Sequence, residues 1–450
     1  MKLRKNDFGK KFKWGVATSS FQIEGSNTVD QKLDSIWDIF TKQKGNIRNN
    51  DNAINACNHY ELWKEDFQLI QNLGVNSYRF SISWPRIVKK NLISKNQKGI
   101  DFYKFQIEEL LEKGIKPFLT LNHWDIPQIF LEKGGWTNRD CIDYFLEYVN
   151  ILSYEYGNII ENWITHNEPW VISHLGYSVG THAPGIKSFR DYLKVSHHLL
   201  LSHGKAIPII RENSKNSEVG IVLNLTPAYP ESDSPYDKKE TLLFNQFFNK
   251  WFLDPLYGNR YPVEIIEQWK TKGYLTENLN FIKDGDYSLM SGKTDFLGIN
   301  YYSRAILKNK KTNNKKFPIK NVSGEKTKFG WEVFPDGLEK LLIDINNDYK
   351  PNKIYITENG CSYDYSVNKE KQINDVNRIN YFKSHLLACR NAIKKGVPLE
   401  GYFHWSLMDN FEWAEGYYHR FGLIHVDYNT YERIPKASFE WYKNFLSSTY

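Results

Sequence analysis

Asn162-Trp163-Ile164-Thr165-His166-Asn167-Glu168-Pro169 runs from a short apolar segment into a glutamate and a proline. A second stretch repeats this arrangement, because Lys353-Ile354-Tyr355-Ile356-Thr357 leads directly into Glu358-Asn359-Gly360. Short runs rich in β-branched residues that stop at polar and turn residues are typical of the strands of a parallel barrel, whose ends carry the functional loops. The two stretches therefore predict strands that end at Glu168 and Glu358.

The same rhythm of apolar run, polar and aromatic loop, and amphipathic helix recurs along the whole chain. Strands are predicted at residues 13–17, 77–81, 117–121, 162–165, 219–223, 296–301, 354–357 and 400–405. Helices are predicted between them, among others at 59–73, 97–113, 139–156, 188–213 and 374–395. This alternation predicts an α/β fold, a closed (β/α)8 TIM barrel that forms a single domain over residues 1–450 with extended βα loops. An open doubly wound sheet is the alternative, but no glycine-rich nucleotide-binding turn follows a strand.

Composition and charge exclude several functional classes. The net charge of +7 comes from lysines spread along the 450 residues, apart from a basic run at 308–316 that we interpret as a solvated loop. Nucleic-acid binding would need basic and aromatic residues organised on one element, so no nucleic-acid partner is expected. No stretch of about 18 apolar residues is present, so no membrane span is expected.

Cysteine and histidine usage points to a cofactor-free protein. Four scattered cysteines without a Cys-x-x-Cys pair fit reduced thiols and a cytoplasmic location. His197, His198 and His203 lie close together in the sequence, but no carboxylate or thiol spacing completes a metal site. We therefore expect neither a metal nor another cofactor, and the sequence leaves open whether the chain forms a homo-oligomer.

Polar and aromatic residues follow every predicted strand, and barrel strands deliver their functional groups from these ends. Amides and carboxylates can pair with sugar hydroxyl groups, while flat apolar rings suit the C–H faces of a pyranose. Two carboxyl groups facing one pocket are what cleavage of a glycosidic bond requires. The predicted partner is therefore a small carbohydrate. The strand-end segments are 20–25, 79–85, 122–124, 167–168, 224, 300–302, 358–359 and 405–413.

From about Phe12 to its end, the chain resembles the family 1 glycoside hydrolases, the β-glucosidase family. The matching stretches occur in the family's order and include Tyr78-Arg-Phe-Ser-Ile-Ser-Trp-Pro-Arg86, Thr165-His-Asn-Glu-Pro169, His182-Ala-Pro-Gly185, Thr357-Glu-Asn-Gly360 and the segments 12–25 and 405–413. The resemblance implies a (β/α)8 barrel and hydrolysis with retention of anomeric configuration.

The resemblance also implies roles for particular residues. Glu168 would be the acid/base, and Glu358 the nucleophile. Arg79 and Tyr302 occupy family positions beside the nucleophile, where they would orient Glu358 and lower its pKa. The pKa of Glu168 should be raised by apolar surroundings and by the charge of Glu358.

Substrate contacts are implied in the same way. Sugar hydroxyl groups would be bound by Gln22, His123, Asn167, Glu412 and Trp413, with Asn167 serving the 2-hydroxyl. Trp405 would stack under the ring, Asn300 would support the acid/base, and Trp331 would be a platform for the aglycone.

Two alternative functions make different demands on the residues of the site. Relatives that act on 6-phosphorylated sugars carry a serine near position 412 followed by a lysine and a tyrosine, whereas this chain has Glu412, His419 and Phe421. A carboxylate there would repel a phosphate. A non-catalytic sugar-binding barrel is disfavoured because both glutamates are present. The preferred glycone (gluco, galacto or fuco) stays open, because Gln22 and Glu412 can bind either epimer at C4.

Overall fold

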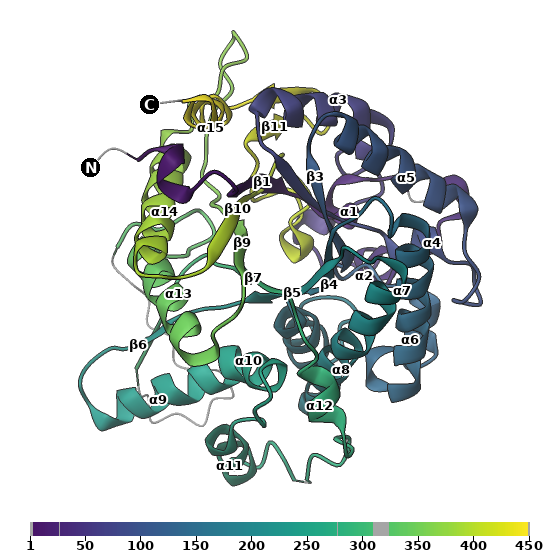
Figure 1. The fold of residues 1–450 in the computed structure, drawn as a ribbon, viewed down its shortest axis with the longest axis vertical. Helices are drawn as coiled ribbons and strands as arrows, with labels where there is room; N and C mark the ends of the chain where they lie inside the picture. The colour runs from purple at the N-terminus through teal and green to yellow at the C-terminus, as the bar shows by residue number, and fades with distance from the viewer. Residues whose placement is uncertain (1–2, 27, 277, 309–323, 449–450) are drawn as a thin grey trace.

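The structure, a computed structural model, describes residues 3–26, 28–276, 278–308 and 324–448. Eight parallel strands close into a barrel in the order β1-β10-β9-β7-β5-β4-β3-β2 (Figure 1). The predicted (β/α)8 barrel is confirmed, and every predicted strand agrees with the observed one to within two residues at each end. The strands are β1 (Lys13–Ala17), β2 (Ser77–Ser81), β3 (Lys116–Asn122), β4 (Asn162–Asn167), β5 (Glu218–Asn224), β7 (Phe296–Asn300), β9 (Ile354–Asn359) and β10 (Leu399–Trp405).

Helices surround the barrel, as Figure 1 shows. The longest are α3 (His59–Leu73), α5 (Gln97–Glu112), α7 (Ile142–Tyr156), α8 (Phe189–Asn213), α13 (Pro335–Tyr349) and α14 (Val376–Lys394). Shorter ones are α1 (Ser20–Ile23), α2 (Ile36–Thr41), α4 (Trp84–Ile87), α6 (Gln128–Glu132), α9 (Pro235–Asn245), α10 (Trp251–Leu256), α11 (Val263–Thr271), α12 (Asp286–Met290) and α15 (Ala437–Ser447). In α3 the spacing of the buried Phe67, Ile70 and Leu73 produces one apolar face, and Gly74 at φ +82° ends the helix.

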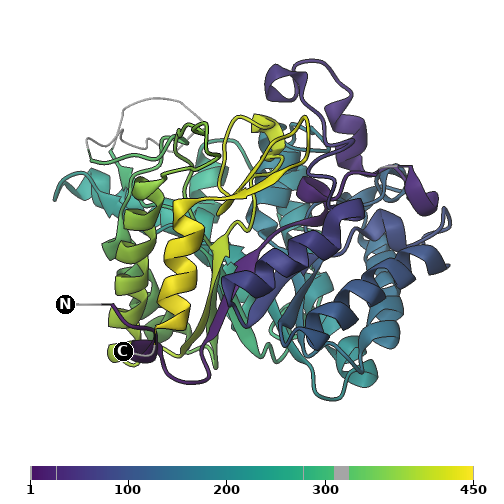
Figure 2. The ribbon, with the colours of Figure 1, turned by 90° about the horizontal axis from the view of Figure 1, so that it is seen from above.

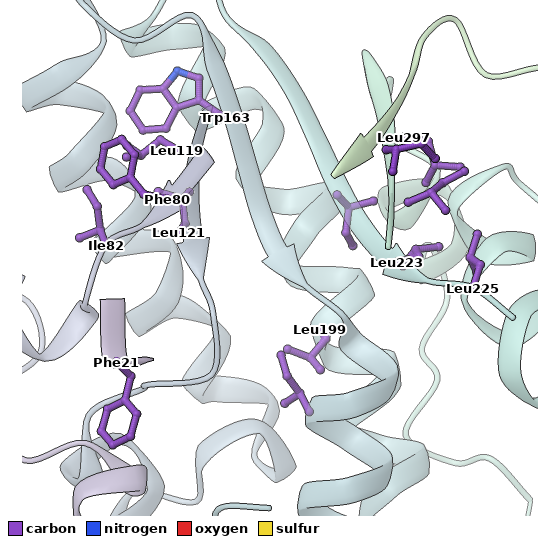
Figure 3. Packing of buried hydrophobic residues seen from close by; sticks show 14 of the residues in the cluster. Phe21, Phe80, Ile82, Leu119, Leu121, Trp163, Leu199, Leu223, Leu225 and Leu297 are labelled. Carbon is purple, nitrogen blue, oxygen red and sulfur yellow. The ribbon is translucent and has the colours of Figure 1, made fainter. Parts of the chain in front are cut away.

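Side chains alternate between the two faces of each barrel strand, and the apolar ones form two layers of hydrophobic core. Residues such as Phe118 point into the barrel, where its ring lies 4.8 Å from that of Phe403 and 5.2 Å from that of Tyr355. Their neighbours Leu119 and Leu121 belong to the other layer, between the strands and the helices (Figure 3). The inner layer fills the barrel below the strand ends, so the polar side chains at those ends pack against a continuous apolar core.

Short elements in the loops were not predicted. Strand β6 (Ala228–Pro230) pairs with β8 (Ala305–Leu307), and β11 (Ile424–Val426) pairs with β12 (Arg433–Pro435). Two π-helices, η6 (Val171–Val179) and η7 (Gln246–Lys250), also occur. The first of them begins three residues after Glu168.

The two ends of the described chain meet on one side of the molecule (Figure 2). Lys5 Nζ donates a hydrogen bond to Leu446 O at 2.9 Å, and β1 pairs with β10. Within the described segments, no helix combines the length and apolar character needed to cross a bilayer.

Candidate active site

Glu168 and Glu358 lie together at the carboxyl ends of the barrel strands, and both are buried. The Asn300 side-chain amide, at the end of β7, connects them: Asn300 Nδ2 donates to Glu168 Oε1 at 2.6 Å and the same side chain hydrogen-bonds to Glu358. Thr357 Oγ1 donates to Asn300 Oδ1 at 2.7 Å, which fixes the orientation of the amide. The two carboxyl groups are therefore close enough for one amide to reach both.

Irregular backbone places both glutamates. The pairing of β4 with β5 shifts register between Ile164 and Asn167, and the pairing of β9 shifts after Ile356 with both of its neighbours, β7 and β10. Extra residues of this kind re-aim side chains and are common beside active sites. Glu168 adopts φ +52°, in the left-handed region, and its N–H donates to Val222 O at 2.8 Å. This strained backbone aims the Glu168 carboxyl group at Asn300.

Arg79 and Tyr302 hold the carboxylate of Glu358. Arg79 Nη1 donates to Glu358 Oε1 at 2.6 Å, and the Tyr302 hydroxyl donates to Oε2 at 2.7 Å. Arg79 Nη2 donates to Asn167 Oδ1 at 2.6 Å, so one buried guanidinium orients residues from two strands. Both oxygens of Glu358 are thus held by donors that favour its ionised form.

Burial controls the proton affinities of the pair. It raises the pKa of Glu168 to about 8, and the charge of Glu358 adds to this rise. Burial also raises the pKa of Glu358, although Arg79 and Tyr302 oppose that rise. Arg79 and Tyr302 thus act in the predicted direction, and burial, which the prediction did not include, is the larger effect on the pKa of Glu358. Among the described residues no cation forms an ion pair with Glu168, whose side chain accepts from Asn300 instead.

Gln22, His123 and Asn167 lie at the same end of the barrel as the two glutamates, and all three are buried. Asn167 Nδ2 lies 3.1 Å from His123 Nε2, and His123 Nδ1 has no hydrogen-bond partner among the described residues. Burial holds the pKa of His123 well below its usual value, so the ring is neutral. Ser19 Oγ donates to Gln22 Oε1 at 2.6 Å. These contacts pre-orient polar groups that can bind hydroxyls.

Three tryptophans predicted from the sequence lie around these polar residues. Trp405 and Trp413 each stack on the His123 ring, with centroids 5.9 and 6.0 Å away. Trp331 lies farther out and is half-buried, 4.9 Å from the Tyr302 ring and 4.1 Å from the Phe329 ring. The aromatic side chains therefore extend outward from the carboxylates.

Glu412, on the loop after β10, lies near Trp405 and Glu358, and one of its carboxyl oxygens has no hydrogen-bond partner among the described residues. Its side chain receives a hydrogen bond from Trp405, whereas the buried Oε2 has no partner among the described residues. Burial raises the pKa of Glu412 to about 8, and the charge of Glu358 adds to the effect. An unpartnered acceptor of this kind can receive a ligand hydroxyl.

Trp124 and Asn410 contribute to the site, although no role was predicted for them. Trp124 Nε1 donates to Asn167 O at 2.9 Å from a residue at φ +83°. Gln22 Nε2 donates to Asn410 Oδ1 at 3.0 Å. Both lie in segments that were predicted to follow barrel strands, 122–124 and 405–413, and this position could have identified them as site residues.

The remaining histidines and the basic run have other surroundings. His197 contacts Asp286, His198 contacts Trp136 O, and His203 lies between Thr165 and Thr294. Across the described part of the chain, no group of three His, Cys, Asp or Glu side chains is arranged to hold a metal. In the basic run 308–316, Lys308 pairs with Glu231 at 2.9 Å, and residues 309–316 lie outside the described residues.

The barrel and its paired carboxylates define the chain as a glycoside hydrolase. Comparison with known proteins agrees with this class. The chain belongs to glycosyl hydrolase family 1, whose model matches residues 4–449, so the resemblance seen in the sequence is confirmed.

Curated relatives span nearly the full chain. Beta-glucosidase A of Thermotoga maritima is 44% identical over 442 residues, covering 98% of each chain, and Beta-glucosidase A of Acetivibrio thermocellus is 43% identical over 449 residues, covering 99% of each. Among solved structures, the Thermotoga maritima β-glucosidase in complex with glucoimidazole matches with a TM-score of 0.93 and 44% identity, covering 97% of this chain and 98% of that chain.

Proposed function

We propose that the protein is a retaining, exo-acting β-glucosidase that releases glucose from cellobiose, short cello-oligosaccharides and aryl β-glucosides. The observation that carries this proposal is the Asn300-linked carboxyl pair, in which Glu358 is held by Arg79 and Tyr302 while Glu168 has its pKa raised to about 8. One group is thus prepared to attack and the other to donate a proton. The β-glucosidase names of the relatives and the glucoimidazole complex support the choice of glycone.

In the first step, a Glu358 oxygen attacks the anomeric carbon as the bond to the leaving oxygen breaks. Glu168 gives its proton to that oxygen, so the aglycone departs as a neutral alcohol. The product is a glycosyl ester on Glu358 with inverted configuration. Arg79 and Tyr302 fix the attacking carboxylate in place, which avoids reorganisation during the reaction.

In the second step, water attacks the glycosyl ester from the opposite face. Esterification removes the negative charge of Glu358, so the pKa of Glu168 falls and its carboxylate can accept a proton from the water. Glucose leaves with its original configuration and Glu358 is regenerated. An alcohol in place of water would give transglycosylation, and β-galactosidase or β-fucosidase side activity is proposed on the same site.

Substrate recognition is assigned to the groups around this pair. Hydroxyl groups of the glycone bind to Gln22, His123, Asn167, Glu412 and Trp413, and the ring stacks on Trp405. Asn300 supports Glu168, and Trp331 is the aglycone platform. The unpartnered His123 Nδ1 and Glu412 Oε2 supply one donor and one acceptor for this purpose.

The 6-phosphosugar alternative remains less favoured. His419, one of the two positions after Glu412 that distinguish such relatives, lies within a packed aromatic group, with its ring 4.4 Å from that of Phe329. The other position is Phe421, whose ring centroid lies 6.2 Å from that of Trp331. Neither side chain supplies a cation for a phosphate, since burial lowers the pKa of His419 to about 4. A single domain and a cytoplasmic location remain part of the proposal, and a homo-oligomer stays open.

Trapping with an activated 2-deoxy-2-fluoro-β-glucoside tests the proposal. The fluorine slows both steps, and the good leaving group restores the first, so the glycosyl ester should accumulate. Intact mass and peptide mapping should show one adduct, on the peptide that contains Glu358. The Glu358→Gln variant is the matched control and should remain unlabelled. Absence of an adduct, together with no hydrolysis of aryl β-glucosides, would overturn the proposal and favour a phosphosugar or a binding function.

The pH profile provides a second prediction. Because Glu168 must be protonated to donate and its pKa is raised to about 8, kcat/KM should fall as the pH rises through about 8. The acid limb should follow protonation of Glu358. Once Glu358 carries the fluorosugar, the pKa of Glu168 should drop, which ¹³C NMR of labelled glutamate can follow. A Glu168 pKa unchanged by trapping would contradict the coupling between the two groups.

A further inference from the structure

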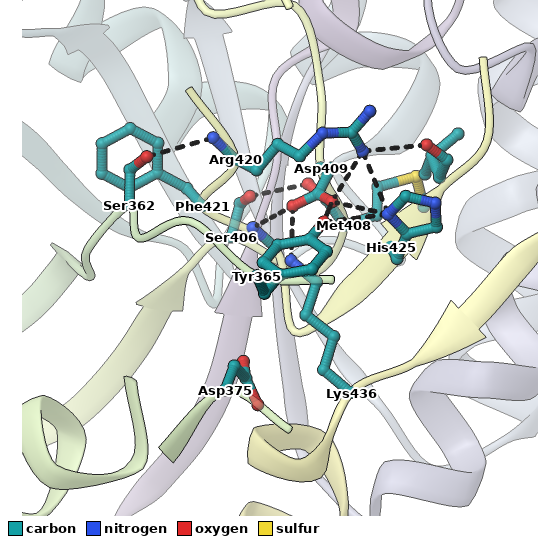
Figure 4. Close-up of polar contacts among 12 residues, drawn as sticks. Ser362, Tyr365, Asp375, Ser406, Met408, Asp409, Arg420, Phe421, His425 and Lys436 are labelled. Atoms are coloured by element: carbon teal, nitrogen blue, oxygen red, sulfur yellow. Dashed lines mark hydrogen bonds and ion pairs between the residues drawn. The ribbon is translucent and has the colours of Figure 1, made fainter. Parts of the chain in front are cut away.

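The loop after β10, residues 406–413, rests on a buried cluster of charges centred on Asp409 (Figure 4). Asp409 and Lys436 both have 0% side-chain exposure, and Lys436 Nζ lies 2.7 Å from Asp409 Oδ1. Gly422 N donates to the same oxygen at 2.9 Å. Arg420 Nη1 donates to Oδ2 at 3.1 Å, and the Tyr365 hydroxyl also donates to Oδ2. A buried carboxylate with this many donors has little freedom to move.

These donors come from three separate parts of the chain. Tyr365 follows β9, Arg420 and Gly422 precede β11, and Lys436 caps α15. The backbone reinforces the arrangement, because Asp409 N donates to Ile424 O at 2.9 Å and Lys436 N donates to Leu423 O at 2.9 Å. Asp409 therefore fastens the start of the loop to the surrounding framework.

Glu412 depends on that framework for its own position. Its side chain has one protein partner, Trp405, and its Oε2 has none among the described residues. The backbone beside it is held by Gln22, which accepts from Phe411 N at 3.2 Å and donates through Nε2 to Phe411 O at 2.9 Å, and by Glu412 N to Gly416 O at 2.7 Å and Glu415 N to Glu412 O at 2.9 Å. Because the carboxylate has a single side-chain partner, it takes its direction from this held backbone, which is also anchored three residues earlier at Asp409.

We propose that Asp409, with Lys436 and Tyr365, is a positioning residue for Glu412 and thereby sets the affinity for the glycone. This inference rests on the proposed function. None of the three residues belongs to the set that faces the sugar. Their contribution is the precision with which Glu412 meets the sugar hydroxyl groups, because a site held loosely loses binding without losing its chemistry.

Double-mutant cycles test the inference. Asp409→Asn and Tyr365→Phe would each be made alone and together with Glu412→Ala, and kcat/KM would be measured on an aryl β-glucoside. If Asp409 acts through Glu412, Asp409→Asn should lower kcat/KM at least about tenfold, mainly through KM, and less than about threefold when Glu412 is already alanine. Tyr365→Phe, which removes one hydroxyl, should show the same pattern at smaller size and covers the case in which Asp409→Asn does not fold.

Asp286→Asn is the matched control. Asp286 is also buried and accepts from Arg139 Nη1 at 2.9 Å and Lys283 N at 2.8 Å, but it lies on α12, far from α15 in Figure 1. This variant should lower the melting temperature and leave kcat/KM within about twofold. Equal losses from Asp409→Asn with and without Glu412, or a loss in kcat alone, would overturn the inference. Trapping at Glu358 in the unmodified protein tests the proposed function separately.

Discussion

Glu358→Ala is expected to lower kcat on aryl β-glucosides by at least about 10⁴-fold while the protein stays folded. The substitution removes the proposed nucleophile, and in the described part of the chain no other carboxylate accepts from both Arg79 and Tyr302. Arg79 keeps its contacts with Asn167 Oδ1 at 2.6 Å and Thr357 O at 3.2 Å, so its charge remains partly compensated. Steady-state kinetics and circular dichroism would measure the two effects. Turnover near the unmodified rate would contradict the nucleophile assignment.

The structure offers a matched control for this variant. Glu24 is another buried glutamate held by one arginine and one tyrosine, with Arg86 Nε at 2.8 Å and the Tyr103 hydroxyl at 2.6 Å. Glu24→Ala should destabilise the fold to a similar degree but keep kcat within roughly tenfold. Added azide should rescue Glu358→Ala and give the α-glucosyl azide, because the anion attacks from the face that Glu358 had used.

Glu168→Ala is expected to separate substrates by their leaving groups. Cellobiose and alkyl β-glucosides need a proton on the departing oxygen, so kcat/KM for them should fall by about 10²–10⁴-fold. Dinitrophenyl β-glucoside leaves without that help, so its kcat/KM should fall far less. Comparing the two substrates on the same variant controls for folding, since misfolding would lower both alike.

The same variant should also alter the basic limb of the pH profile. The fall in kcat/KM near pH 8 is assigned to Glu168, whose pKa burial and the charge of Glu358 raise to about 8. Without that carboxyl group, kcat/KM for the dinitrophenyl substrate should depend on pH in this range only through Glu412, whose pKa is also raised to about 8. Equal losses on both substrates, or an unchanged basic limb, would count against Glu168 as the acid.

Much of the barrel could be predicted because its strands are short apolar runs with clear ends. Segments such as Lys13–Ala17 and Ser77–Ser81 were predicted at their observed bounds. The three-residue pairs β6–β8 and β11–β12 were not, because so few residues show no periodicity. The π-helix Val171–Val179 likewise depends on tertiary packing that local sequence does not encode.

The backbone of the site was less predictable than its residue types. Glu168 precedes Pro169, and a residue in that position normally adopts an extended conformation. It has φ +52° instead, with its N–H donating to Val222 O. For Glu358 the residue types indicated the donors that lower its pKa, Arg79 and Tyr302, but not the burial that raises it.

Pairing of β1 with β10 has a bearing on biosynthesis. Gln22 is added early and Glu412 late, so a ribosome that adds about 5–20 residues per second needs roughly 20–80 s between them. During that interval β1 can pair with β2, but its other edge stays unpaired until β10 is synthesised. An unpaired strand edge can form hydrogen bonds with other chains. The nascent chain should therefore depend on chaperones until β10 emerges, and chains that stop before β10 should aggregate.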